Sequence, residues 1–209
     1  MSILFNNKYR VPTARLQNWN YANEAMYFIT ICTKNKENYF GKIVLETDCV
    51  ETQSVETQFI ASLQPTEIGQ IAHSEWYKTI ELRPDMNLEL GEFVVMPNHI
   101  HGIVIIGENE YNTQRRDAMH RVSTNANDIA YKNQFAPQYK NLSSIIRGYK
   151  SSVTTYARKN NIEFNWQTRF HDHIVRSMDD YHRISNYIVN NPIKWMEDKF
   201  YTNPKDDLK

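Results

Sequence analysis

Two neighbouring runs of strand-forming residues constrain the fold of this 209-residue chain more than any other feature. Residues 88–96 and 101–106 are rich in β-branched and other apolar side chains. Pro97 and Asn98 between them are typical turn residues. Two strands joined by so short a connection pair as an antiparallel hairpin. The sequence therefore predicts a sheet with antiparallel neighbours in this region.

Further elements surround the hairpin in a regular order, because apolar residues recur with helical spacing on either side of it. The other expected elements are a strand over residues 27–33, a turn with a short return over 34–41, an irregular connection over 46–60, a helix over 66–82 with Thr66 as N-cap, a helix over 142–159, a loop into a short strand over 163–176, and a last helix that begins at a capping box over 177–180 and ends near Asn191, before Pro192. The order strand, helix, hairpin, helix, strand, helix predicts an α+β sandwich with an antiparallel sheet.

The length fits a single domain over residues 1–209. We expect residues 1–25 to be an N-terminal extension and residues 107–138, which are polar and without a period, to be a long insertion. Only Cys32 and Cys49 are present, which excludes a disulfide framework. No apolar run reaches the length of a membrane span and no signal peptide is apparent, so we expect a cytoplasmic protein.

The charges of the chain cancel, because it has 24 basic and 24 acidic residues. Proteins that bind nucleic acids usually carry excess positive charge. A nucleic-acid function would therefore depend on local basic patches rather than on net charge.

His99 and His101 are the sharpest local feature. Residues two apart on a strand lie on the same face, so both imidazoles would point the same way while Ile100 faces the core. Two imidazoles in this arrangement could hold a divalent ion. Taken alone, the pair could equally be part of a polar strand face.

Tyr187 and Asn191 form a second feature, since residues four apart lie on one side of a helix. An amide oxygen is a suitable ligand for Mg²⁺ or Mn²⁺, and a phenol can attack a phosphodiester. The alternative is a tyrosine that only packs, and Ile184 and Ile188 on the same helix provide the apolar surface for it.

Taken together, these segments resemble the HUH single-tyrosine transposases. Residues 93–104 (FVVMPNHIHGIV) are similar to the HUH segment of that family, and residues 187–192 (YIVNNP) are similar to its tyrosine helix. Residues 166–176 (WQTRFHDHIVR) resemble the segment that precedes this helix, and residues 27–33 and 143–154 extend the likeness. The pattern is most similar to the REP-associated tyrosine transposases, relatives of small bacterial insertion-sequence transposases.

The resemblance implies a ferredoxin-like sandwich with the HxH motif on a central strand, helices on one face and a C-terminal tyrosine helix. It implies that His99, His101 and Asn191 bind one Mg²⁺ or Mn²⁺ and that Tyr187 is the nucleophile. The implied reaction is cleavage and rejoining of single-stranded DNA beside hairpins through a 5′-phosphotyrosine intermediate. The implied assembly is a homodimer, in which the tyrosine helix serves the histidine pair of its own chain or that of the neighbour.

Other residues are weaker candidates. A second HxH pair, His171 and His173, lies outside the metal site implied by the resemblance, and we expect a structural or DNA-contact role for it. The span 140–159 contains no acid, so it could form either a DNA-contacting or a merely solvated face. The expected DNA contacts are Arg147, Lys150, Arg158, Lys159, Arg169 and Arg176, with Arg10 and Arg15 of lower standing.

Two other functions compete with an active transposase. One is a domesticated protein that binds DNA hairpins without cutting them, although the intact candidate residues argue against it. The other is a hydrolase that uses the HxH pair for zinc, which would leave Tyr187 without a role and lacks a third ligand near the pair in the sequence.

Overall fold

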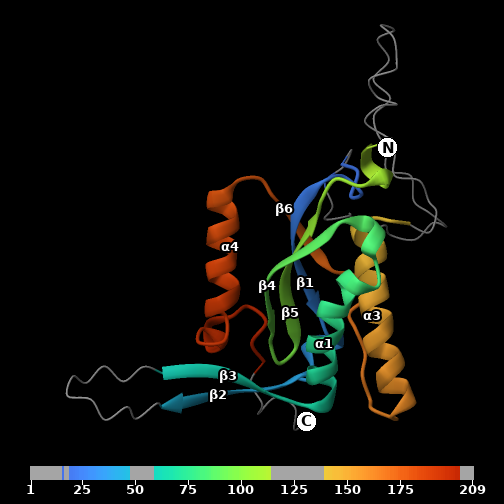
Figure 1. Ribbon diagram of the computed structural model, residues 1–209. Helices are drawn as coiled ribbons and strands as arrows, with labels where there is room; N and C mark the ends of the chain where they lie inside the picture. Colours follow the sequence, from blue (N-terminus) through green and yellow to red (C-terminus); the bar gives the residue numbers. More distant parts are fainter. Residues whose placement is uncertain (1–15, 17–18, 48–58, 114–138, 203–209) are drawn as a thin grey trace, which may run out of the picture.

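The computed structural model describes residues 16, 19–47, 59–113 and 139–202 (Figure 1). Its strands are β1 (Ala25–Cys32), β2 (Gly41–Thr47), β3 (Phe59–Pro65), β4 (Leu88–Val95), β5 (His99–Ile106) and β6 (His171–Val175). Its helices are α1 (Glu67–Glu81), α3 (Leu142–Lys159) and α4 (Met178–Asn190), with 3-10 turns η2 (Lys34–Lys36), η3 (Pro84–Met86) and η4 (Trp195–Glu197).

The central sheet has the strand order β4-β5-β1-β6, and each neighbouring pair is antiparallel. With α1 and α3 as the crossover helices, this is the β-α-β-β-α-β arrangement of ferredoxin-like folds. Strand β5, which carries the HxH motif, is paired on both sides. The expected α+β sandwich with the motif on a central strand is therefore confirmed.

The sheet has a helix layer on each face. Helices α1 and α3 pack against each other and cover one face, whereas α4 lies on the other face (Figure 1). Ile100 points into the main core with Trp76 of α1 and Tyr149 of α3. The residues on either side of Ile100 point the opposite way, toward α4, as the alternation of a strand requires.

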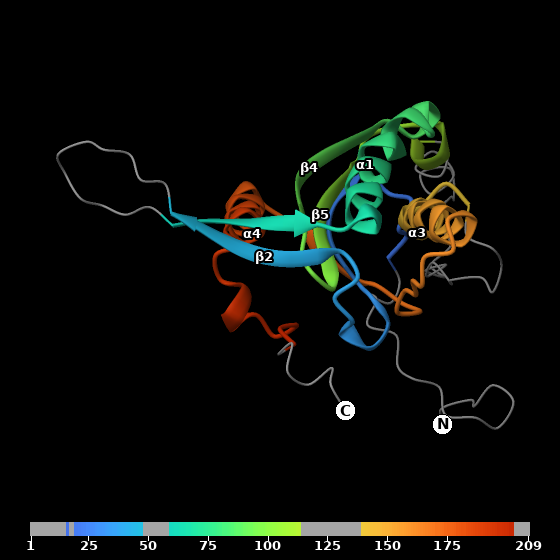
Figure 2. The same cartoon turned by 90° about the horizontal axis from the view of Figure 1, so that it is seen from below.

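The prediction of an irregular connection over 46–60 is wrong at both ends. Strands β2 and β3 pair from Gly41 opposite Pro65 to Thr47 opposite Phe59, and form a ribbon that projects from the body of the molecule (Figure 2). Backbone pairing along a projecting ribbon tolerates polar side chains, because neither side has to be fully buried. Residues 48–58 lie outside the described part of the chain.

The helix boundaries follow the sequence signals. Thr66 caps α1 by accepting a hydrogen bond from the Gly69 amide, and α4 ends before Asn191, next to Pro192. The capping box at the start of α4 is only half formed. Ser177 accepts from the Asp180 amide, but the Asp180 carboxylate binds His173 and Arg183 instead of returning to the cap.

Most of the predicted extension over 1–25 and of the insertion over 107–138 falls outside the described residues. Among the helices in the described part of the chain, none has the length and apolar character needed to cross a membrane.

Gly102, which follows the histidine pair, lies directly beneath the indole of Trp76. A Cβ atom at this position would meet Trp76 Cζ2 at 2.5 Å. That ring cannot give way easily, because it is stacked on Phe93 at 4.6 Å and lies edge-on to Tyr149 at 5.4 Å. We expect Gly102→Ala to lower the free energy of unfolding by about 1–3 kcal/mol, measured by urea denaturation.

Gly148→Ala is the matched control. In α3 the added methyl group meets only the guanidinium of Arg83, the end of a flexible side chain that donates long hydrogen bonds of 3.3 and 3.5 Å to the Thr79 and Ile145 carbonyls. Alanine in a helix interior is favoured over glycine by about 1 kcal/mol, which offsets the loss of these bonds, so this variant should lose less stability than Gly102→Ala. Equal effects of the two substitutions would contradict the packing argument.

Candidate active site

The two histidines of β5 form a buried pair beneath α4. His99 and His101 are 0% and 1% exposed, and their Nε2 atoms lie 3.1 Å apart. The other ring nitrogen of each histidine contacts the protein: His101 Nδ1 lies 2.9 Å from Thr30 Oγ1, and His99 Nδ1 lies 2.9 Å from Asn98 Oδ1. Both Nε2 atoms therefore face a common point.

Asn98 fixes the protonation of the His99 ring. Its amide nitrogen donates to the carbonyl oxygens of Lys36 and Phe200, at 3.0 and 2.8 Å, so its oxygen is the atom that faces His99. The Nδ1 of His99 must then carry the hydrogen, which leaves Nε2 with a free lone pair. Oriented imidazoles of this kind are typical of metal ligands, whose second nitrogen donates to a neighbouring group.

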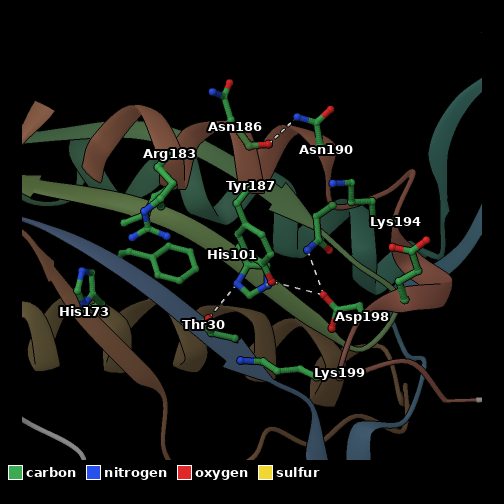
Figure 3. A pocket seen from close by; sticks show the side chains of 14 residues that line it. Thr30, His101, His173, Arg183, Asn186, Tyr187, Asn190, Lys194, Asp198 and Lys199 are labelled. Atoms are coloured by element: carbon green, nitrogen blue, oxygen red, sulfur yellow. Dashed lines mark hydrogen bonds between the residues drawn. The ribbon is translucent and has the colours of Figure 1, made fainter. Parts of the chain in front are cut away.

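Tyr187 reaches the histidine pair from α4 (Figure 3). Its hydroxyl lies 3.1 Å from His101 Nε2 and 3.4 Å from Asp198 Oδ2. The ring lies edge-on to Phe28 and to His101, with centroids 6.1 and 5.2 Å away. The side chain is nevertheless 40% exposed, so a large substrate can reach the hydroxyl from solvent.

Asp198 and Asn191 complete the cluster. Asn191 Nδ2 donates to Asp198 Oδ2 at 3.1 Å, and the Phe200 amide donates to Asp198 Oδ1 at 2.7 Å. The Asn191 amide is thereby oriented, and its Oδ1 is buried without a hydrogen-bond partner among the described residues. A buried acceptor without a partner is unusual and indicates a position where a bound ion or molecule belongs.

Burial sets the charge state of the site. It lowers the pKa of His101 to about 4, and it lowers the pKa of His99 well below its usual range. Both rings are therefore neutral at pH 7, which is the form that binds metal. Burial, followed by the negative charge of Asp198, raises the pKa of Tyr187 to about 12, so its phenol is protonated at the same pH.

The donor set fits a divalent cation. One ligand atom from each of His99, His101 and Asp198 lies within 4.8 Å of the others. The Nε2 atoms of the two histidines lie 3.1 Å apart, and the Asp198 carboxylate lies beside them. Imidazole nitrogens and carboxylate oxygens are donors that divalent cations accept.

The cluster opens into a hollow of about 730 Å³ between the sheet and α4. Arg183, Lys194 and Lys199 line it together with the side chains of the site (Figure 3). Glu197 and Asp198 line it as well, so the three cations outnumber the two carboxylates of the wall, which suits an anionic substrate. His173, from the second HxH pair, also lines this hollow and pairs with Asp180 at 3.0 Å.

The structure brings the four principal candidates together, because His99, His101, Tyr187 and Asn191 share one cluster. Asp198 was missed by the sequence analysis, since it follows the last helix in a segment without periodicity.

The expected DNA contacts lie elsewhere. Arg147, Lys150 and Arg158 border a groove on α3, whereas the side chains of Lys159, Arg169 and Arg176 are exposed outside both hollows.

The fold and the site define the class of the protein: an α+β protein with an antiparallel ferredoxin-like sheet whose buried His99–His101 pair fits the HUH motif. The chain is 34% identical over 188 residues to a protein of Haemophilus influenzae described as "Uncharacterized protein", an alignment that covers 90% of this chain and 91% of the relative. The chain belongs to the same family as that protein.

No protein-family model matches the chain. The solved structure "Structure of the REP associates tyrosine transposase bound to a REP hairpin" is similar with a TM-score of 0.45 and 18% sequence identity, over 90% of this chain and 74% of that one.

Proposed function

We propose that this protein is a single-tyrosine HUH transposase, a nuclease and strand transferase that acts on single-stranded DNA. The observation that carries the proposal is the contact of the Tyr187 hydroxyl with His101 Nε2 at 3.1 Å, which joins a nucleophile to a buried ligand pair. The order of motifs that resembles this family supports it as well. A cytoplasmic location and a single domain over residues 1–209 remain predictions of the sequence.

His99, His101 and Asn191 would hold a Mg²⁺ or Mn²⁺ ion, with Asp198 as a further donor beside them. The bound ion would polarise a scissile phosphate and offset the charge that develops on it. The oxygen of Tyr187 attacks the phosphorus, and the bond between phosphorus and the 3′ oxygen breaks. The phenol loses its proton and the departing 3′ oxygen gains one. The products are a 5′-phosphotyrosine and a free 3′ hydroxyl, which can later reverse the step on another strand.

The partner in this proposal is single-stranded DNA with hairpin ends. Within one chain Tyr187 already reaches its own histidine pair. The proposed arrangement is therefore one in which the tyrosine helix serves its own chain. A homodimer remains a prediction that a measurement of molecular mass in solution would test.

A zinc-dependent hydrolase is the second candidate, and one observation favours it. The sequence offers no third ligand close to the histidine pair. In the structure, Asp198 lies beside the pair and provides one. Two histidines and a carboxylate are a common catalytic zinc set, which would activate a water molecule. A hairpin-binding protein that does not cut is the remaining alternative, and the test below addresses it.

The test uses labelled hairpin DNA drawn from the flanks of the gene, incubated with the protein and Mg²⁺, Mn²⁺ or EDTA. We expect a covalent protein–DNA adduct on a denaturing gel with either ion and none with EDTA. Tight binding without an adduct under every condition would favour the non-cutting binder. Cleavage without an adduct would favour the hydrolase.

A further inference from the structure

Thr30 contacts the His101 ring on the side that faces away from His99 (Figure 3). Thr30 and His101 are partners in the pairing of β1 with β5, and both side chains lie on the face of the sheet that α4 covers. Thr30 is 5% exposed, and its hydroxyl oxygen lies 2.9 Å from His101 Nδ1. A hydroxyl group can donate or accept, so this contact alone fits either tautomer of the ring.

The neighbouring ring decides which tautomer His101 adopts without a metal. A neutral imidazole carries one hydrogen, and the Asn98 oxygen places that of His99 on Nδ1, which leaves His99 Nε2 bare. His101 Nε2 lies 3.1 Å from this bare nitrogen. Two bare nitrogens at this separation would repel each other, whereas a hydrogen on His101 Nε2 forms a hydrogen bond between the rings. His101 Nδ1 is then bare and accepts from the Thr30 hydroxyl.

Tyr187 does not change this assignment, although its hydroxyl also lies 3.1 Å from His101 Nε2. A hydrogen bond from Tyr187 to a bare His101 nitrogen would leave His99 Nε2 facing that nitrogen with no hydrogen between them. The tyrosine has another acceptor, Asp198 Oδ2, at 3.4 Å. Every group therefore has a partner when the hydrogen of His101 is on Nε2, and the two rings belong to one chain of hydrogen bonds.

His101 can bind a metal ion through Nε2 only as the other tautomer. Its hydrogen must then be on Nδ1, where the Thr30 oxygen accepts it. One proton leaves Nε2 and one joins Nδ1 by exchange with water, so the charge of the ring is unchanged. The Thr30 hydroxyl turns from donor to acceptor, and its own hydrogen can point into the hollow that Thr30 lines. A carboxylate or carbonyl in its place could only accept, which would leave the two Nε2 atoms bare and opposed whenever the metal is absent.

We propose that Thr30 is a positioning residue of the metal site, whose hydroxyl allows His101 to change tautomer when a divalent ion binds. The inference rests on the proposed function in taking His99 and His101 as metal ligands, and it does not depend on the cleavage of DNA. Thr30→Val removes the hydroxyl and keeps the shape of the side chain. Because His101 Nδ1 then loses its side-chain partner, we expect the Mn²⁺ affinity to fall roughly 10- to 100-fold.

Isothermal titration of the whole chain with Mn²⁺ measures this affinity. Thr30→Ser keeps the hydroxyl and should bind Mn²⁺ within about threefold of the parent value. Thr79→Val is the matched control, because it removes the hydroxyl of another buried threonine, which donates to the Glu75 carbonyl within α1. This control should also stay within about threefold of the parent. Circular dichroism would verify that all three variants are folded.

NMR spectroscopy of the imidazole nitrogens tests the tautomers directly, with Mg²⁺ as a diamagnetic ion. Long-range proton–nitrogen correlations distinguish the two neutral forms of a histidine ring, and His101→Ala identifies the signals of His101. We expect the hydrogen of His101 on Nε2 in the metal-free parent and on Nδ1 at saturating Mg²⁺. His99 should keep its hydrogen on Nδ1 in both states.

The outcomes separate this inference from the proposed function. If the parent binds Mn²⁺ at the histidine pair, an unchanged affinity in Thr30→Val, or an equal loss in Thr30→Ser or Thr79→Val, would overturn the inference alone. A His101 ring that already carries its hydrogen on Nδ1 in the metal-free protein would do the same. A parent that binds neither ion, or whose affinity is unchanged in His101→Ala, would overturn the metal site of the proposed function as well.

Discussion

Replacement of Tyr187 by phenylalanine is expected to abolish the covalent protein–DNA adduct, with a loss of at least about 10³-fold in its rate of formation. Phenylalanine keeps the ring that packs edge-on against Phe28 and His101, but it lacks the oxygen that contacts His101 and Asp198. Denaturing gels on labelled hairpin DNA measure the adduct. Anisotropy on the same DNA should show unchanged binding, because the substitution removes one hydroxyl group and no charge.

Tyr181→Phe is the matched control for this prediction. Tyr181 lies on the same helix and packs beside the sheet, but it does not line the hollow that contains His101 and Tyr187. This variant should form the adduct at the rate of the parent. Cleavage that survives Tyr187→Phe would contradict a tyrosine mechanism and would favour water activated by a metal at His99, His101 and Asp198.

His101→Ala is expected to weaken Mn²⁺ binding by at least about 100-fold, because it removes one of the two imidazoles that face the common point. Isothermal titration measures the affinity directly. Thermal unfolding provides a second measurement: a metal at about 100 times its Kd stabilises the parent by about 2.7 kcal/mol, and the same concentration should stabilise the variant by about 0.4 kcal/mol or less. Neither measurement depends on cleavage activity.

His173→Ala serves as the control, because it removes a histidine from the other HxH pair. His173 lines the same hollow but pairs with Asp180 rather than with the cluster. Its loss should leave the Mn²⁺ affinity within about twofold of the parent value, since it contacts none of the proposed ligands. An affinity unchanged in His101→Ala, or equally reduced in both variants, would place the metal elsewhere.

The parts of the site that the sequence predicts are those set by local periodicity. Residues two apart on a strand share a face, so the common direction of His99 and His101 follows from the β5 pattern alone. Tyr187 and Asn191 likewise follow from the helical period and from Pro192, which ends the helix. That these two pairs meet, however, depends on α4 crossing the open face of the sheet. Only the resemblance to a family, and not the spacing, implied that meeting.

Asp198 and the β2–β3 ribbon show what local patterns leave out. Asp198 lies beyond the end of α4, and its position depends on hydrogen bonds to Asn191 and to the Phe200 amide rather than on a repeat in the sequence. The ribbon was missed because the sequence over residues 46–60 is largely polar and acidic, so it showed no alternation of apolar and polar residues that would indicate strands. In both cases long-range contacts decide the structure.

Two of the hydrogen bonds of the Asn98 side chain bear on the order in which the site is assembled. Its amide connects the His99 ring with the carbonyl of Phe200, which lies 102 positions later in the sequence than Asn98. During synthesis the sheet strands that carry the histidines leave the ribosome well before α4 and the segment that contains Asp198. A partly synthesised chain therefore contains the two imidazoles but lacks Tyr187, Asn191 and Asp198. If the proposed function is correct, DNA cleavage requires the tyrosine and the carboxylate, so it is expected only after the later segment has folded back onto β5.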